Sequence, residues 1–223
     1  ILRGADMRPG HVVNWKEEEQ RSTNFTEANL DGADFTGSNM SEANLAVSSA
    51  RGAIFRDVVL HAVNLAGANL SGADLSGCNL KNANLTGTNL DGANLKGANL
   101  SDANLRNVDL TKAILDNTNL MGAIHRDAEN SLPDEIEQAL RFHSTWIASN
   151  GRSGMRAEFF DRDLRGLDFS SCDVRGVSFE GADLTGAAFV RSELFLTTFR
   201  RAILDGADFS LARLAGTNFT DCI

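Results

Sequence analysis

The apolar residues of this chain recur every five positions. From Phe25 to Leu120 every fifth residue is large and apolar except Ala50, and a small residue stands two positions before most of them. The same spacing returns one register later, from Phe159 to Phe219. A period of five matches neither the 3.6 residues of a helix nor the 2 of a strand. A repeat this short cannot bury its own apolar residue, so we expect the units to wind into a coil whose turns stack.

Typical units are GADLS at 72–76 and GANLK at 92–96. The pattern A-(N/D)-(L/F)-x-x closely resembles that of the pentapeptide-repeat protein family. The resemblance implies an all-β solenoid, a right-handed quadrilateral β-helix in which four pentapeptides make one square turn. Large and small positions would point inward and the other three outward. The units would then form two blocks of about eight turns in total, interrupted by one α-helix.

The second block alternates Phe with Leu-type residues at its large position. A 20-residue turn would stack Phe159, Phe179, Phe199 and Phe219 in one column and Phe169, Phe189 and Phe209 in the opposite one. Stacking like on like keeps the cross-section constant and avoids voids. A turn of ten residues would fit the alternation too, so the pattern supports the square coil and leaves the shorter turn open.

Two stretches depart from the period and divide the chain. Residues 8–22 shift the register, and because Trp15 keeps the large-residue phase we expect either a return to the coil or a protruding loop. The longer departure lies between His125 and Met155. We therefore expect a first repeat block over 1–126, with its insert at 8–22, a helical connector or cap over 127–151, and a second repeat block over 152–223. The blocks could form one rod or two.

The connector carries the signals of an amphipathic helix. Ser131, Pro133 and Asp134 provide a capping side chain, an early proline and an acid in the first turn, and Asn150-Gly151 is a stop. We expect about four to five turns that cap the end of the first coil or pack between the blocks, because a solenoid end exposes apolar side chains and unpaired strand edges. Contact with a second chain is the alternative. The apolar face comprises Leu132, Ile136, Ala139, Leu140, Phe142, His143, Trp146 and Ile147, and the polar face Asp134, Glu137, Gln138, Arg141, Ser144 and Thr145.

The composition and net charge of the chain restrict the partners and the location that we expect. The chain has 30 acidic and 21 basic residues, a formal net charge of −9, which argues against direct binding of nucleic acid or anionic membrane. No apolar run approaches the roughly 20 residues of a membrane span. Cys78, Cys172 and Cys222 stand at the small position and indicate buried thiols rather than disulfides, which favours a reducing, cytoplasmic location. Since the chain begins inside a repeat, we expect its natural N-terminus to lie upstream.

Several motif-like patterns are consequences of repetition. Glycines five apart, as at Gly92 and Gly97, lack the Lys-Ser/Thr of a phosphate loop, and we interpret them as tight corners. None of the four histidines is spaced as a zinc ligand, and His143 reads as a core histidine bonded to a carbonyl. We expect no catalytic residue, metal or cofactor. We expect the asparagines of the sequons and their variants to form hydrogen-bonded ladders between turns. They are Asn24, Asn39, Asn69, Asn84, Asn99 and Asn218.

One group of outward residues departs from the polar surface. Exposed apolar residues grouped in this way often mark an interface. They predict a surface for a partner or for self-association, with packing against the helix or the first block as the alternative. The group comprises Val190, Phe195 and Leu196, with Leu211 one turn above Arg191, and Arg200 and Arg201 beside them.

Flat repetitive faces without convergent polar groups favour a non-catalytic protein–protein interaction scaffold. Its partner would be an unidentified protein or a second copy. Some members of the family it resembles are DNA mimics that bind DNA gyrase and confer fluoroquinolone resistance, which is the alternative. About 40 Å of B-DNA carries roughly 24 negative charges, whereas this chain has a net −9 with Arg and Lys interleaved. Such mimics usually dimerise through a C-terminal helix, and the helix expected here is internal.

Overall fold

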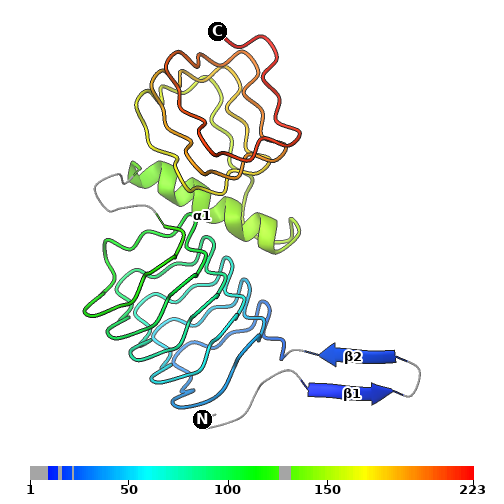
Figure 1. Ribbon diagram of the computed structural model, residues 1–223, viewed down its shortest axis with the longest axis vertical. Coiled ribbons are helices and arrows are strands. Elements are labelled where there is room, and N and C mark those ends of the chain that lie inside the picture. Colours follow the sequence, from blue (N-terminus) through cyan, green and yellow to red (C-terminus); the bar gives the residue numbers. More distant parts are fainter. Residues whose placement is uncertain (1–9, 15–16, 22, 126–131) are drawn as a thin grey trace. The chain divides into compact units, whose positions relative to one another are not determined.

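The computed structural model describes residues 10–14, 17–21, 23–125 and 132–223. It divides into two compact units, residues 1–124 and 125–223, each built around a hydrophobic core of its own (Figure 1). We call the repeats at 23–124 the first coil and those at 157–223 the second coil. Each unit is described by itself.

Both coils are ladders of parallel β-bridges between successive turns. Every bridged pair is 20 residues apart, so four pentapeptides make one turn and the ten-residue turn is wrong. Backbone hydrogen bonds follow the same step, since Phe35 N donates to Ile54 O at 2.8 Å and Ile54 N donates to Ala33 O at 2.8 Å. Figure 1 shows the stacked turns of the first coil. Columns of bridges run through Asn24, Asn44, Asn64, Asn84, Asn104 and Ile124, and through Glu158, Ser178, Thr198 and Asn218.

The large and small positions fill the interior of each coil. In the second coil the predicted phenylalanine columns are present: Phe179 stacks on Phe199 with ring centroids 5.1 Å apart and 4° between planes. The two columns also meet edge to face, as Phe179 and Phe189 do at 5.6 Å and 84°. The first coil is filled mainly by leucine, and Leu75 and Leu95 are fully buried. Spacing along the sequence therefore becomes vertical stacking in the core.

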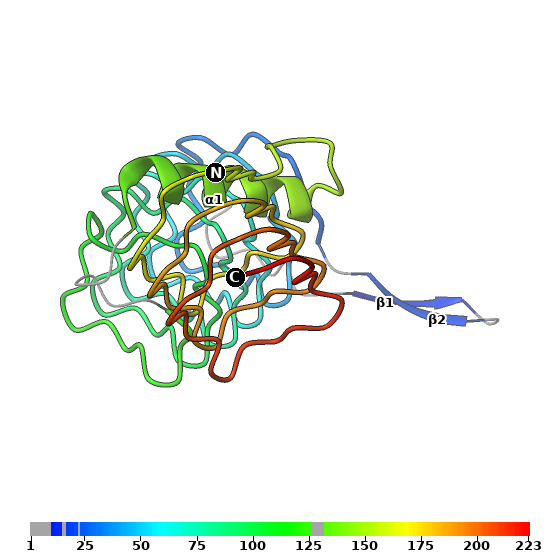
Figure 2. The ribbon, with the colours of Figure 1, turned by 90° about the horizontal axis from the view of Figure 1, so that it is seen from above.

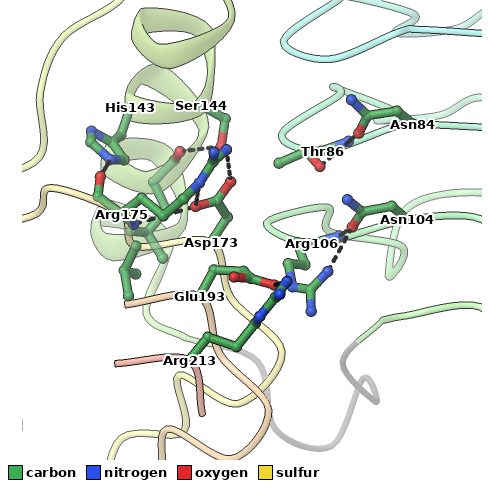
Figure 3. Close-up of polar contacts among 12 residues, drawn as sticks. Asn84, Thr86, Asn104, Arg106, His143, Ser144, Asp173, Arg175, Glu193 and Arg213 are labelled. Atoms are coloured by element: carbon green, nitrogen blue, oxygen red, sulfur yellow. Dashed lines mark hydrogen bonds and ion pairs between the residues drawn. The ribbon is translucent and has the colours of Figure 1, made fainter. Parts of the chain in front are cut away.

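The corners of each turn are closed by short polar side chains. The asparagine before a large residue accepts a hydrogen bond from the backbone two residues on, as Asn84 Oδ1 does from Thr86 N at 3.2 Å (Figure 3). This is an Asx turn, and the sequence interpretation missed it. The expected ladders are also present: Asn84 Nδ2 donates to Asn64 Oδ1 at 3.2 Å, and Asn64 Nδ2 to Asn44 Oδ1 at 3.1 Å. The sequons therefore have a structural explanation.

The segment that interrupts the first coil is a β-hairpin. Strand β1 (Gly10–Asn14) pairs antiparallel with β2 (Glu17–Arg21), so that Gly10 lies opposite Arg21. Figure 2 shows the two strands side by side. Among the described residues, no bridge joins them to the coil. The departure from the five-residue period removes the inward-facing large residues that a further turn would need. Trp15, which kept the repeat phase, lies outside the described residues.

Helix α1 (Asp134–Ala148) follows Pro133 and carries three acids in its first turn, where they favour the positive end of the helix dipole. Its N-cap makes no side-chain hydrogen bond, and Ser131, the predicted cap, lies outside the described residues. Glu137 takes part of this role, because its Oε1 accepts from Leu132 N at 3.2 Å. The predicted stop is confirmed: Gly151 has a φ of +81° and donates to Trp146 O at 2.8 Å.

The apolar face of α1 packs on the second coil. Ile136 and Leu140 belong to the same buried cluster as Phe159, so the helix covers the first turn of that coil. The sequence predicted that the helix caps the end of the first coil or packs between the blocks, and both stay predictions. Phe142 was expected on the buried face but is 45% exposed, whereas Glu137 and Ser144, expected on the polar face, are buried. In the described part of the chain, no helix has the length and hydropathy of a membrane span.

Candidate functional site

The grouped outward residues occupy three successive corners of the second coil. Backbone pairing fixes their stacking, because Arg191 N donates to Ser210 O at 3.0 Å and Leu196 N to Ala215 O at 3.1 Å. Val190 and Leu211 therefore share one corner column, Phe195 and Leu196 occupy the next, and Arg200 and Arg201 the one after. We call this surface the corner patch: Val190, Phe195, Leu196, Arg200, Arg201 and Leu211.

The apolar members of the corner patch face solvent. Leu196 is 59% exposed and Phe195 47%, while Val190 is half-buried. Leu211 is 74% exposed and lies in the last turn of the given sequence, where the core positions Leu214 and Phe219 are exposed as well. Isolated exposed apolar residues are ordinary, but large ones grouped on neighbouring corners are not. The second coil therefore keeps an apolar surface that contributes little to its own core.

The backbone of the corner patch is also strained. Leu196 and Leu211 have φ values of +58° and +59°, the left-handed region in which a branched side chain costs roughly 1–2 kcal/mol. One turn below and one turn above Leu196, the same position is Gly176 and Gly216. The corner accepts glycine, so leucine is not required by the turn. Strain held at an exposed position is typical of functional surfaces.

The side chain of Leu196 has a defined position on the neighbouring turn. A methyl group added to Gly216 would come within 3.0 Å of Leu196 Cδ2, so the leucine lies over the bare corner above it. Gly176 N donates to Phe195 O at 2.9 Å, which fixes the corner from below. The corner of Phe195 and Leu196 is therefore held by backbone hydrogen bonds to the corners below and above it.

The arginines of the corner patch lie over a carboxylate. Arg201 Nη2 is 3.0 Å from Glu180 Oε1, and Arg200 Nη1 is 3.9 Å from the same oxygen. The Arg200 and Arg201 side chains are 52% and 58% exposed, against 26% for Glu180. The guanidinium groups face the solvent and the carboxylate lies beneath them, while Asp221 lies at the corner directly above Arg201.

A third pair on the adjoining side of the coil repeats the arrangement. Arg213 Nη1 lies 3.5 Å from Glu193 Oε1 (Figure 3), and the side chains are 78% and 18% exposed. The sequence analysis did not select Arg213. Its signal was available, because Arg213 stands 20 residues after Glu193 and hence directly above it.

Beneath the corner patch, a buried polar contact joins α1 to the coil. His143 Nδ1 accepts from Ala157 N at 3.2 Å, so Nε2 carries the proton and donates to Arg175 O at 2.8 Å (Figure 3). Burial lowers the pKa of His143, and its ring stacks on Trp146 with centroids 5.7 Å apart. The histidine holds the helix in place.

Arg175 connects this contact to the patch. Its Nε and Nη2 donate to Asp173 Oδ1 and Oδ2 at 2.7 and 2.6 Å, a two-bonded fork that raises the pKa of the guanidinium. The next residue is Gly176, whose amide bonds to Phe195. Helix α1, the Arg175–Asp173 ion pair and the corner of Phe195 are therefore linked through successive backbone contacts.

The described residues offer little for catalysis. Among them no group of three or more His, Cys, Asp or Glu side chains could hold a metal ion. Burial raises the pKa of the Cys78 thiol to about 12, and burial also raises that of Cys222. A reactive cysteine needs a lowered pKa and access to solvent, so neither thiol is prepared to act as a nucleophile.

The family model described as pentapeptide repeats matches residues 21–57, 53–92, 88–124, 163–201 and 192–223, in eight copies. Several solved structures are similar. A pentapeptide repeat protein of the Arabidopsis thaliana thylakoid lumen is 31% identical over 49% of this chain and 70% of its own, with a TM-score of 0.37. One from the cyanobacterium Cyanothece is 28% identical over 56% and 87%, with a TM-score of 0.30.

A third similar structure is QnrB1, a plasmid-mediated fluoroquinolone resistance protein. It is 17% identical over 100% of this chain and 89% of its own, with a TM-score of 0.40. A comparison with curated proteins gave no match.

Proposed function

The chain belongs to the pentapeptide repeat family, and from this premise we propose that it is a non-catalytic scaffold that binds another protein through the corner patch. Its coils are then right-handed quadrilateral β-helices. Proteins of this family are in general structural and interaction proteins. The coil supplies a rigid edge, and the patch supplies the contact.

The observation that carries the proposal is the pair of exposed leucines at strained corners. A coil selected for stability alone would place glycine, asparagine or aspartate at Leu196 and Leu211, as it does at most corners. Apolar groups on a rigid support lose little entropy when they bind, which makes them effective anchors. A contact surface accounts for both the strain and the exposure.

A DNA-mimicking gyrase inhibitor is the weaker candidate. A mimic must present carboxylates in place of phosphates. In the second coil Glu180 and Glu193 lie beneath more exposed arginines.

We propose the cytoplasm as the location, since Cys78 and Cys222 form no disulfide.

Site-specific photo-crosslinking tests the proposal. A benzoylphenylalanine in place of Phe195 would be irradiated in cells, with the same residue in place of Asp205, on a corner outside the patch, as the matched control. We expect one identified protein to crosslink at 195 and not at 205. Its purified form should bind the wild type, and Leu211→Gly should weaken that binding by about tenfold, equivalent to about 1.4 kcal/mol. Equal crosslinking at both positions contradicts the proposal.

A further inference from the structure

We infer that the partner contacts the second coil through an acidic segment that carries apolar side chains, laid along one edge of the coil from the corner patch to the end of α1. This inference rests on the proposed function and specifies the chemistry of the partner. It is drawn from where exposed apolar and cationic groups lie along that edge.

The apolar surface continues below Phe195 along the same edge. Arg156 Nε donates to Gly176 O at 2.7 Å, which places the 155–156 segment next to the corner of Arg175 and Gly176. Met155 N in turn donates to Phe142 O at 3.2 Å. Met155 is 67% exposed and Phe142 45%. Phe195 and Leu196 thus form one apolar group, and Met155 and Phe142 form a second one. The two groups are separated by two turns of the coil, about 10 Å.

Cationic side chains line this edge. The exposed fractions of the Arg175 and Arg213 side chains are 44% and 78%, while their partners Asp173 and Glu193 are 5% and 18% exposed. With Arg200 and Arg201 over Glu180, every one of these ion pairs turns its arginine outward. From residue 132 onward the chain contains no lysine, so the cations are all guanidinium groups suited to carboxylates. The exposed groups of these ion pairs are cationic in a chain with a net charge of −9, and Asp221 is the acid beside them, one corner above Arg201.

This charge argues against self-association through the same edge. In a two-fold dimer the patch would face its own copy. The arginine-bearing edge as a whole would then face a second arginine-bearing edge, and like charges brought together in an interface are unfavourable. An acidic segment gains from the same arrangement. Phe195, Leu196 and Met155 supply apolar contacts that a phosphate backbone would not use.

The test uses the full chain and labelled synthetic peptides in fluorescence anisotropy. One 16-residue peptide contains glutamate with leucine and phenylalanine, a second replaces glutamate by lysine, and a third replaces the apolar residues by serine. We expect the first to bind, with affinity falling as salt rises, and the other two to bind at least about tenfold more weakly. Equal binding of the acidic and basic peptides, or no binding of the first at millimolar concentration, overturns the inference. So does tighter binding of single-stranded DNA.

Variants locate the binding. Arg200→Glu with Arg201→Glu should weaken the acidic peptide by about tenfold or more, and Arg165→Glu, on a corner outside the patch, should leave it within about twofold. An equal loss in both overturns the inference. Sedimentation of the wild type should show either a monomer or a dimer that Phe195→Ser leaves intact. A dimer that Phe195→Ser dissociates would show that the patch binds a second copy of this chain.

The segment crosslinked at position 195 separates the two proposals. If its sequence is acidic and apolar, both stand. If it is basic or neutral, the scaffold proposal stands and the inference about the partner fails.

Discussion

The two coils share one repeat but use their corners differently. Both have residues with positive φ at the corner position. Among the described residues of the first coil, five of the nine non-glycine examples are aspartate or asparagine, such as Asp57, Asn82 and Asn117, and the other four are Glu27, Glu42, Val47 and Ala62. Aspartate and asparagine side chains tolerate that conformation. In the second coil the same position holds Arg191, Leu196, Arg201 and Leu211 beside Asp161, Ser171 and Asp221.

The difference shows where the second coil departs from local preference. Bulky residues stand at four of the five corners from Arg191 to Leu211, and the fifth is Gly206. Natural sequences violate local rules mostly at functional sites. The regular first coil shows what the repeat requires, and the exceptions in the second coil show what it does not.

The cores differ as well, and this provides the largest expected effect. Phe179 is fully buried and contacts phenylalanine rings above, below and to the side. Phe179→Ala should lower the free energy of unfolding by about 3–5 kcal/mol, because it leaves a cavity in a stack with no way to collapse. Urea unfolding would be followed by Trp146 fluorescence in a Trp15→Phe background.

The control for that core substitution is Phe142→Ala. Phe142 is 45% exposed, so its removal should change the unfolding free energy by no more than about 0.5 kcal/mol. A loss below about 1 kcal/mol for Phe179→Ala would show that the phenylalanine columns are not essential to the second coil.

The corner comparison predicts a smaller effect of opposite sign. Leu211→Gly should raise the unfolding free energy by roughly 1–2 kcal/mol, because it removes strain at φ +59° and a side chain that is 74% exposed. Asn117→Gly, at φ +56° in the first coil, should change it by only a few tenths. Thermal melting of both variants checks this. A destabilised Leu211→Gly protein would mean that the leucine serves the fold rather than a partner.

The smallest effect concerns His143 and the link between α1 and the second coil. Burial lowers the pKa of His143 from the ordinary 6.5. The charges of Arg156 and Arg175 lower it further, and the charge of Asp173 raises it. The folded state therefore favours the neutral ring. Its contribution to stability is present above about pH 6.5 and is lost as the pH falls through the folded pKa.

Melting temperatures at pH 8 and pH 5 measure the His143 effect. The wild type should lose stability at pH 5, and His143→Gln should reduce that loss. If His143→Gln and the wild type respond equally to pH, the contact of His143 with Ala157 and Arg175 does not couple to protonation.

The sequence predicted the coil, the phenylalanine columns and the helix with its stop at Asn150-Gly151. It did so because each rests on a local rule or on a period that repetition makes visible. It left the hairpin undecided, since one short departure from the period does not reveal antiparallel pairing. It also assigned Phe142 and Glu137 to the wrong faces of α1. Periodicity gives the direction of a side chain but not what lies beside it.

For the corner patch, the sequence selected the apolar residues and two arginines but not what makes them accessible. Two features were readable in retrospect: bulky residues where glycine or asparagine is usual, and acids 20 residues away from arginines. Which member of each ion pair faces the solvent was not readable. That depends on side-chain packing between turns.

The sequence by itself determined the repeat, its inward and outward positions and the places where the pattern fails, because a five-residue period is a property of the chain alone. Only the tertiary structure decided the 20-residue turn, the coil that α1 covers and the outward orientation of the arginines. Those depend on contacts between residues 20 or more apart in sequence, whose energies no local pattern records. The function we propose lies in that second group.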